Sequence, residues 1–171
     1  EHRIRIVIVD DQALFRGGIA MLIQSQSDLE LVGEAGNGAD ALSLVSATAP
    51  DLVLMDLRMP VMDGIEATER LMAAPTPPRV LVLTTFDLDA SAARAIRAGA
   101  SGFVLKDADP EFLLAAIRTV HAGSAVIAPS AVTALLEHLG GASRPEPPEF
   151  GALTAREREI FRGQAAETGK P

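Results

Sequence analysis

The feature that most constrains this chain is a repeated alternation of short apolar runs with segments of helical period. The runs are rich in Val, Ile and Leu, most without polar alternation, and they span Ile4–Val9, Leu31–Ala35, Leu52–Met55, Val80–Leu83 and Gly102–Leu105. Such runs are typical of strands buried on both faces of a parallel sheet. The sequence therefore predicts an α/β fold, with a five-stranded parallel sheet and helices on both faces.

Segments with helical period lie between and after these runs. The first places Phe15, Ile19 and Leu22 on one face. Three more are expected over residues 40–47, 65–73 and 89–98, and a fifth after Asp109 as N-cap and Pro110 at the first helical position. A sixth, over 130–139, has an apolar stripe that the five-fold repeat leaves without a partner. We expect it to associate with another surface.

Composition excludes several classes of function. The chain has no cysteine, so disulfides and thiolate metal sites are excluded. Its three histidines, His2, His121 and His138, lack metal-ligand spacing. The formal net charge of −8 repels nucleic acid and attracts cations. No signal peptide or membrane span is apparent, so we expect a cytoplasmic protein without membrane contact.

Polar residues of complementary chemistry stand at the ends of the predicted strands. Asp10 and Asp11 follow the first strand and Asp56 follows the third. Thr84 ends the fourth, and Lys106 follows the fifth. Ligands of an open α/β sheet bind in the crevice outside the carboxyl ends of its strands. These five side chains are therefore expected to converge there.

This set of side chains points to phosphoryl transfer. Crowded carboxylates repel one another, and oxygen ligands alone suit Mg²⁺. A carboxylate can attack phosphorus, while Mg²⁺, the Lys106 ammonium and the Thr84 hydroxyl each take one phosphoryl oxygen. Singly, the acids could be helix caps, Thr84 a strand-end hydroxyl and Lys106 a surface charge. Their joint placement favours transfer of a phosphoryl group to an aspartate.

Residues 4–123 resemble a response-regulator receiver domain of two-component signalling. The motifs that carry the resemblance are IVIVDDQ (6–12), LVLMDLRMPVMDG (52–64), VLVLTTFD (80–87) and GFVLK (102–106). The resemblance implies a flavodoxin-like strand order, 2-1-3-4-5. It also implies that Asp56 is the phosphoacceptor, that Asp11 and Asp56 ligate Mg²⁺ directly, and that Asp10 does so through a water.

Further roles follow from the same resemblance. The backbone carbonyl of Arg58 is expected to be a third Mg²⁺ ligand. Thr84 resembles the switch hydroxyl and Lys106 the phosphate-binding amine. Phe103 holds the switch-aromatic position, although it lacks the hydroxyl of a tyrosine. The side chains of Arg58 and Phe86 flank the path of the hydrolytic water, so we expect them to slow dephosphorylation.

The remainder of the chain narrows the subgroup. Lys106 is followed by Asp107, and the run KDADPEFLLAAI (106–117) resembles NarL/LuxR-type regulators. LTAREREIF (153–161) resembles the start of a LuxR-type helix-turn-helix, but the residues after it do not continue that motif. We thus expect a receiver domain at 1–123, a helix and linker at 124–152, and an incomplete output domain at 153–171. Specific DNA binding then requires the complete output domain of a parent protein.

The expected function is that of a phosphoacceptor module in a transcriptional response regulator. A sensor histidine kinase donates the phosphoryl group, and the phosphorylated chain is expected to form a homodimer. The protein is not expected to be an enzyme beyond its own phosphorylation and dephosphorylation. One alternative is a stand-alone receiver or phosphorelay shuttle without DNA output. Another is a phosphatase of the haloacid dehalogenase type, but that family has a D-x-D motif after its first strand, and here Asp10 and Asp11 are adjacent.

Overall fold

A computed structural model describes residues 2–85 and 90–127 of the chain. Their parallel sheet contains β1 (Ile4–Val9), β2 (Leu29–Ala35), β3 (Leu52–Asp56), β4 (Arg79–Thr84), β5 (Gly102–Leu105) and β6 (Val126–Ile127). The strand order is β2-β1-β3-β4-β5-β6. The predicted α/β class and the predicted order of the first five strands are confirmed.

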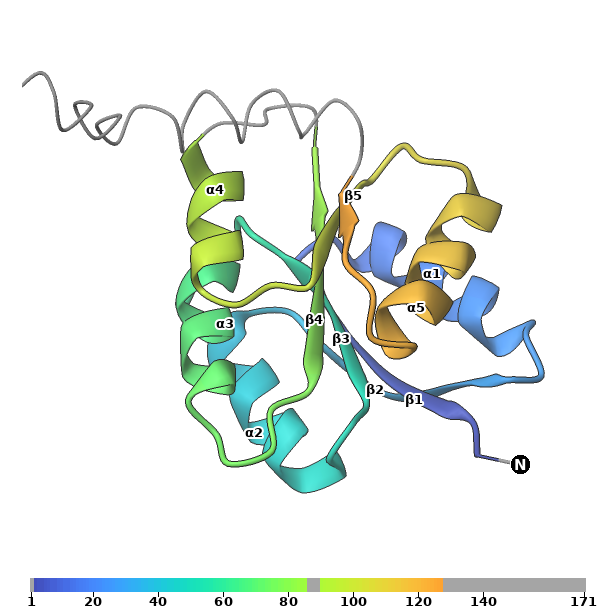
Figure 1. Ribbon diagram of the computed structural model, residues 1–171, viewed down its shortest axis with the longest axis horizontal. Coiled ribbons are helices and arrows are strands. Elements are labelled where there is room, and N and C mark those ends of the chain that lie inside the picture. The colour runs from blue at the N-terminus through green and yellow to red at the C-terminus, as the bar shows by residue number, and fades with distance from the viewer. Residues whose placement is uncertain (1, 86–89, 128–171) are drawn as a thin grey trace, which may run out of the picture. The chain divides into compact units, whose positions relative to one another are not determined.

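Helices cover both faces of this sheet, as expected. They are α1 (Ala13–Gln24), α2 (Gly38–Thr48), α3 (Gly64–Met72), α4 (Ala90–Arg97) and α5 (Pro110–His121). Helices α1 and α5 lie on one face, and α2, α3 and α4 lie on the other (Figure 1). Because β1 and β3 are central, Ile6, Ile8 and Leu54 are fully buried on the α1–α5 side. Of the predicted helices, the one over 130–139 lies outside the described residues.

Strand β6 is an addition to the predicted five-stranded sheet. After α5, Gly123 adopts a φ of 101° and the chain turns back to run parallel to β5. The pairing requires a glycine at position 102, because a Cβ there would lie 2.1 Å from the Val126 carbonyl oxygen. The pairing of β6 with β5 extends the sheet beyond residue 123, the predicted end of the receiver domain. Most of the predicted linker and output segments lie outside the described residues.

The N-termini of α2, α3 and α5 differ in how they are capped. The Asn37 and Asp63 side chains cap α2 and α3 by accepting bonds from the N–H groups of Asp40 and Glu66, at 2.9 and 2.8 Å. Asp109 is the N-cap of α5, as predicted, but its side chain makes no capping hydrogen bond. Pro110 at the first helical position and Glu111 in the first turn therefore supply the local start signals.

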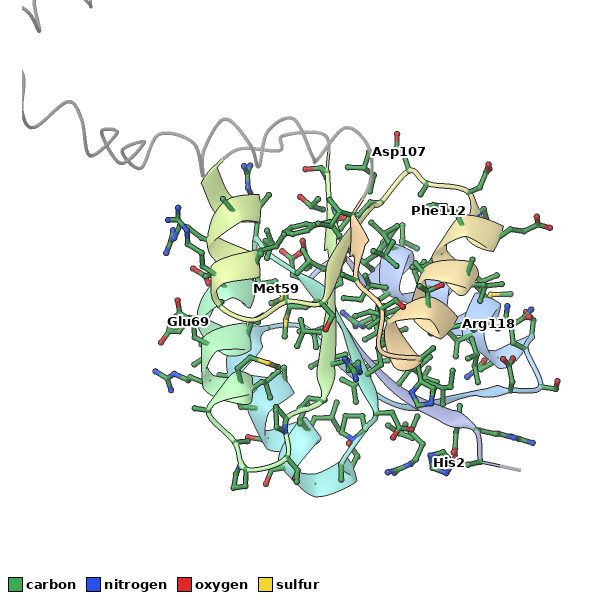
Figure 2. All side chains as sticks on the ribbon, viewed as in Figure 1. His2, Met59, Glu69, Asp107, Phe112 and Arg118 are labelled. Atoms are coloured by element: carbon green, nitrogen blue, oxygen red, sulfur yellow. The ribbon has the colours of Figure 1, made fainter. Side chains whose placement is uncertain are left out.

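An exposed cluster fixes α5 against the turn before β2. Arg118 of α5 donates to both carboxylate oxygens of Asp28, at 2.8 and 3.0 Å, and to Gln26 at 3.0 Å (Figure 2).

No helix within the described ranges is both long and apolar enough to cross a membrane.

Candidate functional site

Three carboxylates meet at the carboxyl edge of the sheet. Asp10 and Asp11 directly follow β1, and Asp56 is the last residue of β3, its neighbour in the sheet. Each offers an oxygen that lies within 4.8 Å of the other two. Asp10 is fully buried, Asp56 is 7% exposed and Asp11 is open to solvent. The predicted convergence of the acids is confirmed.

The Lys106 ammonium lies among these acids. Its Nζ is 2.6 Å from Asp10 Oδ2 and 3.4 Å from Asp56 Oδ2. Its backbone N–H donates to the Thr84 carbonyl at 2.8 Å, which ties the end of β5 to the end of β4. The amine predicted from the end of the fifth run is therefore the cation of the cluster.

Residues at the start of α1 hold Asp10 in place. Asp10 Oδ1 accepts from the Gln12 backbone N–H at 2.8 Å. The Asp10 carbonyl accepts from Arg16 Nη1 at 2.6 Å, and Arg16 Nε also pairs with Glu34 at 3.2 Å. The end of β1 is thereby fixed from both its backbone and its side chain.

The loop after β3 packs directly on the Asp56 backbone. The Gly64 N–H donates to the Leu57 carbonyl at 2.9 Å. A Cβ on Gly64 would lie 2.0 Å from the Asp56 carbonyl oxygen, so only glycine allows this approach. Val61 in the same loop has a φ of 69°, an uncommon conformation for a β-branched residue.

The electrostatics of the cluster favour a bound cation. Burial, and secondly the negative charge of Asp10, raise the pKa of Asp56 to about 6. The Lys106 ammonium and a hydrogen bond from the Arg58 backbone N–H lower that pKa in part. Buried Asp10 Oδ2 has the Lys106 ammonium beside it but makes no hydrogen bond among the described residues. One lysine thus lies beside two buried carboxylates, and a divalent cation would neutralise the charge that the lysine leaves.

A small hollow of about 200 Å³ opens over the cluster. Asp11, Asp56, Arg58, Thr84 and Lys106 all line it. Thr84 is 8% exposed, and its hydroxyl donates to the Thr85 carbonyl at 3.3 Å. Arg58 is exposed at the rim. Two of the three predicted acids, Asp11 and Asp56, therefore share one cavity with the predicted hydroxyl and amine, while Asp10 lies buried beside it.

Two predicted aromatic positions have different outcomes. Phe103, the predicted switch aromatic, is 1% exposed and packs in the core on the α2–α4 side. Phe86 lies outside the described residues. Its predicted effect on dephosphorylation, shared with Arg58, stays a prediction.

The sequence reading missed two neighbours of Lys106. Gln12 Oε1 lies 3.3 Å from the Lys106 Nζ, and the ammonium lies 4.7 Å from the centroid of the Phe15 ring. Both residues follow the acid pair within one helical turn. Their position just after Asp10 and Asp11 was the signal that could have placed them near the site. The helical period of α1 instead indicated that Phe15 is a core residue.

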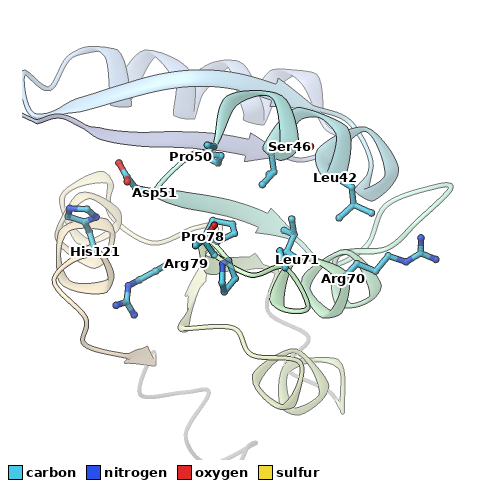
Figure 3. Close-up of a pocket in the computed structure, with 14 residues that line it drawn as sticks. Leu42, Ser46, Pro50, Asp51, Arg70, Leu71, Pro78, Arg79 and His121 are labelled. Carbon is cyan, nitrogen blue, oxygen red and sulfur yellow. The ribbon is translucent and has the colours of Figure 1, made fainter.

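A wider hollow of about 670 Å³ lies at the opposite edge of the sheet. Asp51 and Arg79, at the amino ends of β3 and β4, line it together with His121 (Figure 3). It contains none of the predicted site residues. Its size therefore does not identify the functional site.

Comparison with known proteins agrees with this geometry. Residues 6–118 match the response regulator receiver domain family. The chain is 38% identical over 165 residues to the transcriptional regulatory protein LnrK of Bacillus subtilis, covering 92% of this chain and 75% of that protein. It is 33% identical over 157 residues to the nitrate/nitrite response regulator protein NarL of Escherichia coli K12, covering 92% of this chain and 73% of that protein.

Solved structures give the same result. A LuxR-family two-component response regulator from Aurantimonas sp. SI85-9A1 superposes with a TM-score of 0.74 at 36% identity, covering 81% of this chain and 99% of that chain. The receiver domain of NarL from Mycobacterium tuberculosis gives a TM-score of 0.69 at 36% identity, covering 72% of this chain and 99% of that chain. The chain belongs to the response regulator receiver domain family, and its relatives are NarL/LuxR-type transcriptional regulators of two-component systems.

Proposed function

We propose that Asp56 accepts a phosphoryl group from a sensor histidine kinase in a Mg²⁺-dependent reaction. The observation that carries this proposal is the meeting of three carboxylates, one lysine and one threonine at a single edge of the sheet. Asp56 suits the nucleophile because it lines the hollow and has its carboxylate beside the Lys106 ammonium. Asp10 is less suited, because it is fully buried.

The residues of this chain divide the work of the reaction. An Asp56 carboxylate oxygen attacks the phosphorus of a phosphohistidine, the new O–P bond forms, and the old P–N bond breaks. The electron pair of that bond stays on the imidazole nitrogen, which then takes a proton from solvent. Lys106 neutralises one phosphoryl oxygen and the Thr84 hydroxyl donates to another.

The site fits Mg²⁺ in ligand type and charge. Asp10, Asp11 and Asp56 offer only hard oxygen ligands, and the Arg58 carbonyl would complete the set. We assign Asp11 and Asp56 to direct contact and Asp10 to contact through a water. When bound, Mg²⁺ supplies positive charge that offsets the phosphoryl oxygens and the crowded carboxylates.

Phosphorylation would act as a switch and not as turnover of a separate substrate. We assign Thr84 and Phe103 to the response, because Thr84 lines the hollow and Phe103 is buried in the adjacent β5. The signal would favour a homodimer and reach DNA only through a complete LuxR-type output domain. A cytoplasmic location follows from a kinase donor of this type.

Intact-protein mass spectrometry tests the proposal. Acetyl phosphate with Mg²⁺ should add the mass of one phosphoryl group to the wild-type chain. The addition should disappear in Asp56→Asn and in the presence of EDTA. Asp107→Asn is the matched control, since it removes one exposed carboxylate beside Lys106 that does not line the hollow. Undiminished labelling of Asp56→Asn would overturn the assignment.

A further inference from the structure

The Lys106 ammonium has two kinds of contact. Two are anionic, to Asp10 and Asp56. Two are neutral and come from the start of α1, to the Gln12 side-chain oxygen at 3.3 Å and to the Phe15 ring at 4.7 Å. The Lys106 side chain is only 11% exposed, so its contacts with protein replace most of its water.

The two kinds of contact respond differently to a bound cation. A divalent ion at the three carboxylates would compete with the ammonium for the same oxygens of Asp10 and Asp56 and would repel it. The Phe15 ring does not ligate such an ion. Its attraction for the ammonium therefore persists when the anionic contacts weaken.

Phe15 is well placed to serve as a fixed platform. It packs against the buried residues on the α1–α5 side of the sheet. Phe15 and Lys106 both line a hollow of about 510 Å³ between α1 and α5, which Leu113 also lines. The ring is thus held by packing, and the Lys106 ammonium lies over its face.

We propose that Phe15 is a positioning residue for phosphoryl transfer. Its ring face holds the Lys106 ammonium at the site while the carboxylates are occupied by Mg²⁺, so that the amine remains available to a phosphoryl oxygen. Gln12 supports the same position through its side-chain oxygen. The inference rests on the proposed function of Asp56, since it assigns a role within that reaction.

Replacing the ring tests its face separately from its bulk. Phe15→Leu keeps an apolar side chain but removes the π face, and Phe15→Tyr keeps that face. A partly desolvated cation–π contact corresponds to a rate change of roughly 3- to 30-fold. Phe15→Leu should lower the phosphorylation rate at saturating acetyl phosphate and Mg²⁺ by about that factor. Phe15→Tyr should stay within about 2-fold of wild type.

Ile19→Ala is the matched control for packing. Ile19 lies one turn further along α1 and packs against the same buried cluster, but it has no ring to offer the Lys106 ammonium. It should lower the melting temperature of the protein without slowing phosphorylation. Equal slowing by Ile19→Ala and Phe15→Leu would show that Phe15 acts only through packing and would overturn the proposal.

A second readout does not depend on activity. Lys106 and Lys170 are the only lysines in the chain, so isotope labelling of lysine gives two sets of side-chain NMR signals. The Phe15 ring should shift the Lys106 ε-protons upfield of those of Lys170, with Mg²⁺ present. The shift should vanish in Phe15→Leu and remain in Phe15→Tyr.

The outcomes separate this inference from the proposed function. An absence of labelling in the wild-type chain would refute the role of Asp56. Wild-type labelling with an unchanged rate in Phe15→Leu, or with equal losses in Phe15→Leu and Phe15→Tyr, would refute the role of Phe15 alone. A ring-current shift that is lost when Mg²⁺ binds would refute it as well.

Discussion

Substitution of Gly64 offers a direct test of how the loop after β3 supports the phosphoacceptor. In Gly64→Ala, the new methyl carbon would lie 2.0 Å from the Asp56 carbonyl oxygen and 2.9 Å from Leu57 Cα. Carbon atoms in contact are normally about 3.5–4.0 Å apart. Both obstacles are backbone atoms, so no side chain can rotate away and the loop itself must move.

The expected cost can be worked from these contacts. Overpacking of a rigid site costs about 1–3 kcal/mol, and this case should lie at the upper end. Movement of the loop also weakens the bond from the Gly64 N–H to the Leu57 carbonyl, which contributes about 1 kcal/mol. We expect a loss of about 3–4 kcal/mol in the free energy of unfolding, together with slower phosphorylation because the Asp56 backbone shifts.

Gly17→Ala is the matched control. A Cβ on Gly17, within α1, meets nothing within 4 Å, so alanine should stabilise the protein by about 0.5–1 kcal/mol. Urea titrations followed by far-UV circular dichroism would measure both variants. If Gly64→Ala unfolds within about 0.5 kcal/mol of wild type and is phosphorylated normally, the close approach at Asp56 does not constrain the protein.

Three further predictions concern the charges of the site. The pKa of Asp56 is raised from 3.8 to about 6, so the folded state binds this proton more tightly than the unfolded state does. The contribution of the proton to the free energy of unfolding is therefore full below pH 3.8 and is lost as pH rises through about 6. In EDTA, Asp56→Asn should thus be more stable than wild type at pH 7.5 but not at pH 4.5, and equal differences in urea titrations at both pH values would contradict this. Lys106→Ala should bind Mg²⁺ at least as tightly as wild type by calorimetry, because a positive charge is removed from an acidic site. It should nevertheless be phosphorylated more slowly, because one phosphoryl oxygen loses its counter-charge. Weaker Mg²⁺ binding would count against this role of Lys106. The double variant Arg58→Asn/Phe86→Ala should lose its phosphoryl group faster than wild type, and an unchanged decay rate would show that neither side chain shields the site.

The fold was predictable where burial alone dictates the sequence. Central strands such as β3 and β4 are covered on both faces, so their apolar runs are continuous and easily identified. Strand β6 has two residues and depends on the lack of a side chain at Gly102. That requirement is a tertiary contact and leaves no periodic signal in Val126 and Ile127.

The candidate site was predictable to the extent that strand ends define it. Parallel strands bring their carboxyl ends to one edge, so Asp10, Asp56 and Lys106 could be grouped from their positions alone. The contact between Lys106 and Phe15 could not, because it depends on side-chain direction across two elements far apart in the chain. The positive φ of Val61 was equally hidden, since a valine there runs against residue preference.

The identity of the phosphorylated residue tests the central claim most directly. An acyl phosphate on an aspartate is reduced by borohydride to homoserine, which marks the modified position permanently. After treatment with acetyl phosphate and Mg²⁺, reduction and peptide mass spectrometry should find homoserine at position 56 and at no other aspartate. Homoserine at position 10 or 11, or its absence from a chain that has gained a phosphoryl group, would contradict the account.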